Sequence, residues 1–210
     1  KIVLKDEYGD VNFYLLPFTK PGYIRHLFEE GTITSYASAI RALIERENIN
    51  YNERNVLVSH QFYVAGDTKP ETCDSEQVYI SVGGIDSVDI ASVEKFDYVA
   101  LGHLHGSQSI GKKHIRYSGT PLKYSVSEQN HKKSITLVTI NDKASDINIE
   151  TIPLISTQDV RNIKGSLSEV ISQATDENRH DYVSITLTDE DEIYKPKEQL
   201  EEHYDHILEV

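Results

Sequence analysis

The chain has 210 residues, of which 38% are hydrophobic and 26% are charged. This composition is typical of a globular protein and excludes a disordered chain. The net charge of −13 argues against nonspecific phosphate binding by bulk electrostatics. No apolar run approaches the roughly 20 residues of a membrane helix. The single cysteine, Cys73, excludes an internal disulfide and a cysteine-based zinc site within one chain, and it fits a reducing cytoplasm.

Two features suggest that the sequence is a piece of a longer protein. It contains no methionine, and it opens on Lys1-Ile2-Val3-Leu4, which is typical of the middle of a strand. We therefore expect further residues upstream of Lys1. An engineered or processed start is the alternative interpretation.

The first sixty residues predict two strands, a helix and a third strand. Lys1–Lys5 and Asn12–Leu16 have the pattern of strands joined by a turn. Apolar residues at helical spacing predict a helix over Thr34–Glu47. The apolar run Asn55–Ser59 then predicts a short buried strand that ends at His60.

The middle of the chain predicts one long loop and several short elements. Tyr63–Gly84 is polar and rich in turn formers, which is typical of a surface loop. Val88–Glu94 predicts a short helix before the buried strand Phe96–Leu101. His114–Ser118 and Ile135–Ile140 then predict an antiparallel pair of strands.

Composition and charge change near Asn141–Pro153. Residues 1–150 hold 16 basic and 20 acidic residues, a net charge of −4, whereas residues 151–210 hold 5 basic and 14 acidic residues, a net charge of −9. We therefore predict two domains, with the boundary between residues 150 and 151.

The tail predicts alternating strands and helices. Ser166-Leu167-Ser168-Glu169 has the form of a capping box at the start of a helix. Tyr182–Thr188 predicts a half-buried strand. Proline is tolerated in the first turn of a helix, so Pro196 predicts a last helix that runs to the end of the chain, with an apolar stripe of Leu200, Tyr204, Ile207 and Leu208.

The most informative motif is Gly102-His103-Leu104-His105, which follows the buried strand Phe96–Leu101. Histidines at positions i and i+2 share one face of an extended chain, with Cα atoms about 6.5 Å apart. That separation lets two imidazoles reach two metal ions about 3.5–4 Å apart, the spacing of two-metal phosphoesterase sites. The glycine lets the backbone turn sharply. The motif therefore predicts metal-assisted phosphoryl chemistry.

His60 ends another predicted strand. If that strand and Phe96–Leu101 are neighbours in one sheet, the histidines converge beyond the strand ends, where the sites of open α/β sheets lie. Imidazole suits manganese, zinc or iron. We predict three metal ligands, His60, His103 and His105. A mononuclear zinc site remains an alternative, and His60 taken alone is more typical of a core histidine.

Carboxylate ligands are not apparent in the sequence. Two divalent ions need carboxylates to neutralise charge and to bridge the metals. The chain has no Asp-x-His, Gly-Asp-x-x-Asp or Gly-Asn-His-Asp motif. We expect these ligands upstream of Lys1.

The segment 102–134 is locally basic, with six basic residues against one acid. We predict that it holds DNA phosphates, through Lys112, Lys113 and Lys123, although scattered lysines often belong to a solvated surface. Tyr117 and Tyr124 would stack on bases, but tyrosines at strand positions more commonly belong to the sheet or core.

Five segments carry a resemblance to a known family: Phe13–Phe18, Val58–Phe62, Phe96–His105, Arg116–Ser125 and Asn130–Ser134. They resemble the bacterial SbcD nuclease subunits, which belong with the Mre-type recombination nucleases of the calcineurin-like metallophosphoesterases. The Gly-His-x-His motif alone is typical of the superfamily, whereas the block Tyr117–Ser125 narrows the resemblance to SbcD. The resemblance covers nearly the whole chain.

The resemblance implies an α/β fold: the C-terminal part of a calcineurin-like sandwich of mixed sheets flanked by helices (1–150), then the start of a small, truncated α+β capping domain that orients DNA (151–210). His60 and His103 would bind one of two Mn²⁺ ions and His105 the other, with Mg²⁺ as a possible substitute. The remaining ligands and the proton-donating histidine would lie upstream of Lys1. The chain alone would therefore hold no catalytic residue and little or no metal.

The resemblance also implies an activity and partners. The parent protein would be a cytoplasmic exonuclease and endonuclease that hydrolyses phosphodiester bonds at DNA ends and hairpins in DNA repair, recombination and replication. It would work with an SbcC-type ATPase, as a homodimer, without a membrane. Two alternatives remain: another calcineurin-like phosphoesterase, such as a nucleotide or protein phosphatase, and a non-catalytic interaction fragment.

Overall fold

A computed structural model describes residues 1–77 and 87–210. The chain forms two compact units. The first comprises residues 1–121 and 132–154, and the second comprises residues 122–131 and 155–210. Within the described residues, no helix combines the length and apolar character that crossing a bilayer requires.

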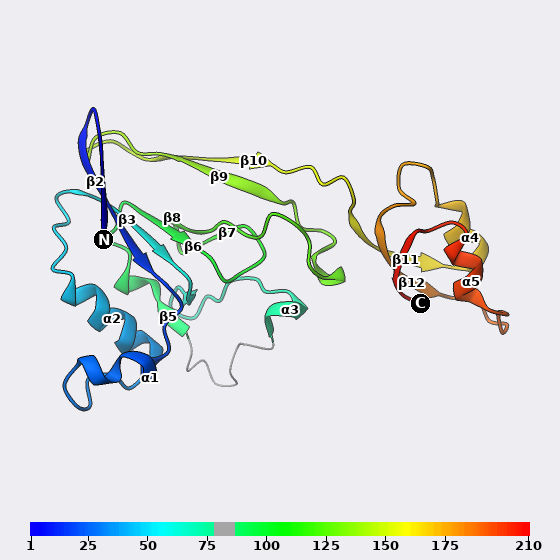
Figure 1. Cartoon of the computed structure of the whole chain (residues 1–210), viewed down its shortest axis with the longest axis horizontal. Coiled ribbons are helices and arrows are strands. Elements are labelled where there is room, and N and C mark those ends of the chain that lie inside the picture. The colour runs from blue at the N-terminus through cyan, green and yellow to red at the C-terminus, as the bar shows by residue number, and fades with distance from the viewer. Residues whose placement is uncertain (78–86) are drawn as a thin grey trace. The chain divides into compact units, whose positions relative to one another are not determined.

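The described part of the first unit is built on a mixed six-stranded sheet of order β1-β2-β3-β6-β8-β7 (Figure 1). The four inner strands β2, β3, β6 and β8 are parallel, and the two outer strands are antiparallel to their neighbours. The strands are β1 (Ile2–Asp6), β2 (Gly9–Leu16), β3 (Arg54–Ser59), β6 (Tyr98–Leu101), β7 (Gln108–Ile110) and β8 (Lys112–Tyr117).

Successive side chains of a strand point to opposite sides of the sheet, and two neighbouring residues of β3 pack against different elements. Leu57 of β3 packs in the cluster that contains Ile40 of helix α2 (Tyr36–Arg46). Val56, the preceding residue, packs with side chains of the hairpin β9–β10, which lies on the other side of the sheet from α2 (Figure 1). The hairpin strands are β9 (Ser134–Thr139) and β10 (Asn148–Pro153).

Short elements complete the first unit. Strands β4 (Phe62–Val64) and β5 (Ser87–Asp89) form a parallel pair. Two four-residue helices, α1 (Pro21–Ile24) and α3 (Asp74–Gln77), lie in the described connections. A single turn of 3₁₀ helix at 25–27 follows α1, and another at 90–92 follows β5.

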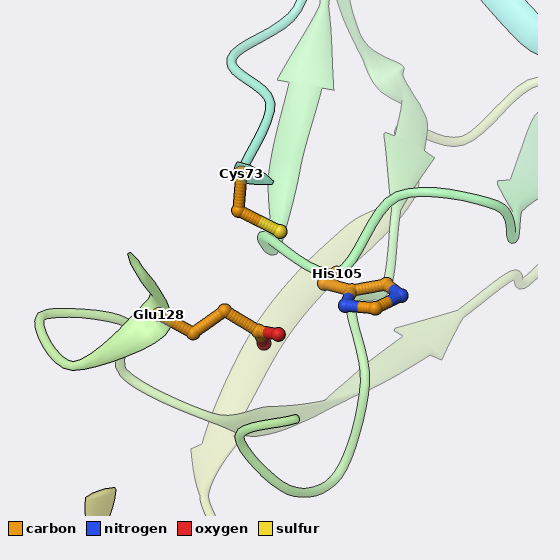
Figure 2. Close-up of side chains that lie close together, drawn as sticks. All are labelled: Cys73, His105 and Glu128. Carbon is orange, nitrogen blue, oxygen red and sulfur yellow. The ribbon is translucent and has the colours of Figure 1, made fainter. Parts of the chain in front are cut away.

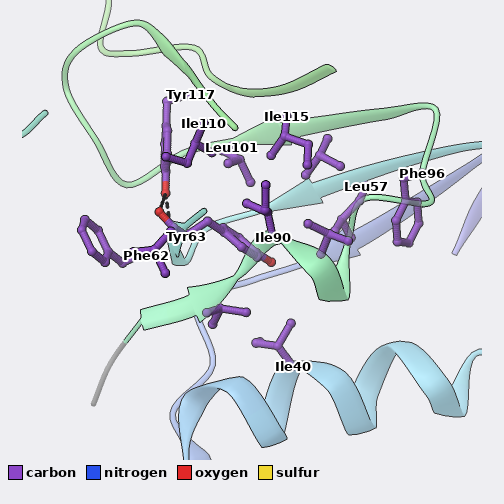
Figure 3. Packing of buried hydrophobic residues seen from close by; sticks show 14 of the residues in the cluster. Ile40, Leu57, Phe62, Tyr63, Ile90, Phe96, Leu101, Ile110, Ile115 and Tyr117 are labelled. Atoms are coloured by element: carbon purple, nitrogen blue, oxygen red, sulfur yellow. Dashed lines mark hydrogen bonds between the residues drawn. The ribbon is translucent and has the colours of Figure 1, made fainter. Parts of the chain in front are cut away.

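Two buried tyrosines fix the segment that follows β3 (Figure 3). The Tyr63 backbone N–H donates to the Tyr117 hydroxyl at 2.7 Å, and that hydroxyl donates to the Gln61 carbonyl at 3.3 Å. The Tyr63 hydroxyl lies 3.0 Å from Ser59 Oγ. Burial raises the pKa of Tyr63 to about 12, so its phenol stays protonated at neutral pH. The segment that begins at His60 is thereby held by the core.

The second unit contains a three-stranded parallel sheet of order β11-β12-β13 among its described residues. Helices α4 and α5 connect the strands, and Val170, Leu200 and Tyr204 are buried in its core. The elements are β11 (Val160–Gly165), α4 (Leu167–Ser172), β12 (Tyr182–Leu187), α5 (Pro196–Glu201) and β13 (His206–Glu209).

Residues 122–131 belong to the second unit although they lie between two parts of the first in the sequence. They contain one 3₁₀ turn, Val126–Glu128. Lys123 Nζ pairs with Asp159 at 2.7 Å, and the Asn162 backbone N–H donates to the Gln129 side chain at 3.1 Å. The change in composition near 141–153 does not reveal that residues 122–131 belong to the second unit. Residues 148–153, which lie within that change, form β10 of the first unit.

Local predictions are largely confirmed. The first two strands, the strand before His60 and the strand before Gly102 lie where expected. Helix α2 starts after Ser35, whose side chain accepts from the Ser38 backbone, and α4 starts after Ser166 with the predicted capping box to Glu169. The mixed α/β class is confirmed. The second unit has parallel strands joined by helices, which is an α/β arrangement instead of the expected α+β.

Predictions that depend on long-range contacts are partly wrong. β8 pairs with β6 and β7, and β9 pairs with β10, so His114–Ser118 and Ile135–Ile140 are not partners. The last helix ends at Glu201, and Ile207 packs against the core from strand β13.

The prediction of a surface loop over residues 63–84 is also wrong at its start, because Tyr63 is fully buried in β4. Its residues 78–84 lie outside the described part of the chain. The helix expected over 88–94 is replaced by the end of β5 and one 3₁₀ turn.

Replacing Tyr117 by Phe tests the tyrosine lock. The Tyr63 N–H would lose its buried acceptor, which costs about 1–3 kcal/mol of unfolding free energy. Urea denaturation followed by circular dichroism measures this loss. Tyr23→Phe, at an exposed tyrosine of the same unit, is the matched control and should leave the transition midpoint unchanged. Equal midpoints for both variants would contradict the assigned role.

Candidate metal centre

The predicted ligands lie at the carboxyl edge of the parallel strands. His60 follows β3 and Gly102 follows β6, and the two strands are direct neighbours with Ser59 opposite Leu101. The Gly102 N–H donates to the Ser59 carbonyl at 2.9 Å, which extends the pairing by one residue. The condition for the histidines to converge, that these two strands are neighbours, is therefore met.

His60 and His103 face each other across this edge. Their ring centroids are 5.4 Å apart, and the rings are nearly perpendicular at 88°. Phe18, which follows β2, stacks on His103 at 6.2 Å and 5°, and Phe62 contacts the same imidazole edge-on at 6.3 Å. Two aromatic side chains thus limit the positions that the His103 ring can take.

Burial lowers the pKa of His103, and the neighbouring His60 lowers it further. The His103 imidazole is therefore neutral at physiological pH. The neutral ring has a free lone pair, which is the form that binds a metal ion. The surroundings of His103 therefore favour the neutral form of its imidazole, which can bind a metal ion, over the charged form.

The backbone at the motif is tightly constrained. A Cβ at Gly102 would lie 2.7 Å from His60 Nδ1, so only glycine leaves room for the His60 ring in this position. His103 has φ +90°, a conformation that non-glycine residues adopt at a cost of about 1–3 kcal/mol. Such conformations are concentrated at functional sites.

His105 is held through its backbone. Its N–H donates to a carboxylate oxygen of Glu76, and its carbonyl accepts from the Thr120 N–H at 3.1 Å and from Lys133 Nζ at 3.0 Å. Cys73 lies beside it, with Sγ within 4.8 Å of a His105 ring nitrogen (Figure 2). Cys73 is buried, which corrects its expected place in a polar loop.

The structure brings the three predicted histidines to one edge of the sheet. Within the described residues, their ring nitrogens do not all lie within 4.8 Å of one another. Their role as metal ligands stays a prediction.

The lysines predicted to contact nucleic acid lie in different settings. Lys112 forms an ion pair with Glu94 at 2.6 Å, and Lys113 is exposed on β8. Lys123 is largely buried in the second unit, where it pairs with Asp159. Tyr117 is fully buried and belongs to the core, whereas Tyr124 is exposed. DNA contact by the three lysines stays a prediction.

Sequence reasoning missed Glu76 and the role of Lys133. Glu76 lies in α3, within the segment interpreted as a surface loop, and yet it is only 4% exposed. It is 29 residues from His105, and no periodic pattern links the two positions. In the sequence, Lys133 stands out only as one of several basic residues.

Replacing Gly102 by Ala tests the close approach of the His60 ring to Gly102. The added methyl group would displace the His60 ring, and overpacking of this kind costs about 1–3 kcal/mol. The imidazole resonances of both His60 and His103 should shift in ¹⁵N NMR spectra. Gly22→Ala is the control, because a Cβ there meets nothing within 4 Å. Unchanged imidazole resonances in G102A would contradict the geometry.

Comparisons with known proteins show what the chain is similar to. Residues 156–210 match the family SbcD_C, described as "Type 5 capsule protein repressor C-terminal domain". Over 205 residues the chain is 32% identical to the SbcD subunit of the nuclease SbcCD from Staphylococcus epidermidis (strain ATCC 12228 / FDA PCI 1200), and the match covers 96% of this chain and 53% of that protein. The chain thus spans about half the length of this curated relative. The chain is thus similar over nearly its whole length to about half of an SbcD nuclease subunit, and its residues 156–210 match the SbcD_C family.

Proposed function

We propose that this chain carries part of the metal centre of a DNA nuclease subunit. The observation that supports this best is the placement of His60 and His103 at the ends of adjacent parallel strands, with ring centroids 5.4 Å apart. The same chain is 32% identical to a nuclease subunit. In this proposal His60 and His103 bind one metal ion and His105 binds a second.

We propose manganese as the metal, held by carboxylate ligands in addition to these imidazoles. Imidazole nitrogen is a ligand for first-row divalent ions, and burial keeps the His103 ring in its neutral form. A pair of such ions, when bound, activates the attacking water and offsets charge on the phosphodiester. The residues of this chain hold the ligands in place: Phe18 and Phe62 flank His103, and the core tyrosines fix the segment after His60.

The name of the relative suggests a partner for this chain. That relative is named as one subunit of the nuclease SbcCD, so we propose an SbcC-type ATPase as the partner of this chain. We further propose DNA ends and hairpins as substrates, in DNA repair and recombination in the cytoplasm, and a homodimeric assembly. The second unit, which contains the residues that match SbcD_C, would orient the DNA.

Replacing His103 by Ala tests the metal-ligand assignment. In the full-length protein, manganese-dependent hydrolysis of a DNA phosphodiester should fall by at least about 100-fold, because one ion loses a ligand. His114→Ala is the control: His114 lies on β8 and contacts the Glu94 carbonyl. Retained activity in H103A would overturn the assignment. Cleavage of nucleotides or phosphoproteins without DNA cleavage would instead support a phosphatase.

The 210-residue chain alone should show little or no nuclease activity. The reason is that its sequence lacks the carboxylate motifs that two divalent ions need. Incubation of the purified chain with labelled linear duplex DNA and manganese measures this. Robust cleavage with equimolar chain and DNA would contradict this prediction, because it would show that residues of this chain complete the site.

A further inference from the structure

The two peptide groups that flank the His105 Cα are both held by ionisable side chains from distant parts of the first unit. The His105 N–H donates to Glu76, 29 residues earlier in the sequence. The His105 carbonyl accepts from Lys133 Nζ at 3.0 Å, 28 residues later. A carboxylate thus meets the N–H and an ammonium group meets the carbonyl, and each charge has the sign that strengthens its hydrogen bond.

Each of the two side chains is itself fixed by a second contact. The other Glu76 oxygen accepts from the Cys73 backbone N–H at 2.8 Å, and Glu76 is buried. Lys133 Nζ also donates to Thr120 Oγ1 at 2.8 Å. The Thr120 backbone N–H supplies the remaining bond to the His105 carbonyl. These contacts make a connected network around one residue.

Close packing of the backbone supports the same network. Gly119 has φ +79°, and a Cβ there would lie 2.9 Å from the His105 carbonyl oxygen. Only glycine lets the turn that carries Thr120 reach this carbonyl. The chain therefore folds tightly around the His105 main chain instead of leaving it exposed on a loop.

We propose that Glu76 and Lys133 are positioning residues for the His105 imidazole. Fixing both adjacent peptide groups fixes φ and ψ of His105, and these angles set the direction of its Cα–Cβ bond. Replacing a side chain that orients a metal ligand commonly lowers metal affinity by about 10–100-fold. The inference rests on the proposed function, in which His105 binds a metal ion.

This role differs from the one that the sequence suggested for the basic segment. A lysine that binds DNA phosphate lies with its ammonium group in solvent. Lys133 is half-buried, with its ammonium group bonded to His105 and Thr120, whereas its neighbour Lys132 is exposed. The two adjacent lysines therefore form a matched pair for experiment.

The test compares Mn²⁺ binding by four variants of the full-length protein: Glu76→Gln, Lys133→Gln, Lys132→Gln and His105→Ala. Free Mn²⁺ is measured by electron paramagnetic resonance, without DNA. We expect Lys133→Gln and Glu76→Gln to raise the dissociation constant of one site by about 10–100-fold. Lys132→Gln should leave it unchanged. Lys133→Gln should also leave DNA affinity and its salt dependence unchanged.

The sign of the Lys133→Gln effect separates positioning from simple electrostatics. Removing a positive charge near a cation site should strengthen Mn²⁺ binding, whereas loss of positioning should weaken it. Tighter or unchanged Mn²⁺ binding in Lys133→Gln would therefore overturn the inference. So would a lower DNA affinity with a reduced salt dependence, which would indicate a phosphate contact.

The His105→Ala variant separates this inference from the proposed function. If H105A does not weaken Mn²⁺ binding, the ligand assignment fails. If H105A weakens binding and the Glu76 and Lys133 variants do not, only the positioning role fails. Should those variants not fold, hydrogen exchange in the unmodified protein decides. The His105 amide should exchange at least about 100-fold more slowly than an unprotected amide, and rapid exchange would overturn the inference.

Discussion

The close pairing of β3 with β6 is the constraint on which the proposed centre depends. The Gly102 N–H bonds to the Ser59 carbonyl, and the missing side chain of Gly102 leaves space for the His60 ring. Parallel pairing places both carboxyl ends at one edge of the sheet, so the side chains that follow them meet there. A larger residue at this position would displace the His60 ring from the place it takes here.

The core and the proposed centre are parts of one network. The Tyr117 hydroxyl bonds to the backbone on both sides of Phe62, and Phe62 contacts His103. β8, which carries Tyr117, pairs with β6, which leads into the histidine motif. Packing that stabilises the unit therefore also restricts the proposed ligands. The strained backbone of His103 persists because these contacts surround it.

Sequence reasoning succeeded where the determining contacts are local. The caps at Ser35 and Ser166 act over three residues, and the buried strands before His60 and Gly102 follow from short apolar runs. The candidate histidines are recognisable because they follow those runs, and the family resemblance gives them roles. Strand partners and the contacts of Glu76 and Lys133 could not be predicted, since each joins residues far apart in the sequence. Helical spacing of apolar residues near Ile207 was equally misleading, because a buried strand also satisfied those side chains.

Residues 122–131 interrupt the first unit in sequence but belong to the second, and this limits where the chain can be divided. The polypeptide passes between the two units three times, after Pro121, His131 and Leu154. A cut at the last of these points would leave Asp159 without Lys123 and the Asn162 N–H without Gln129. The second unit is thus discontinuous in sequence, and residues 155–210 produced alone would lack the part of it that residues 122–131 supply.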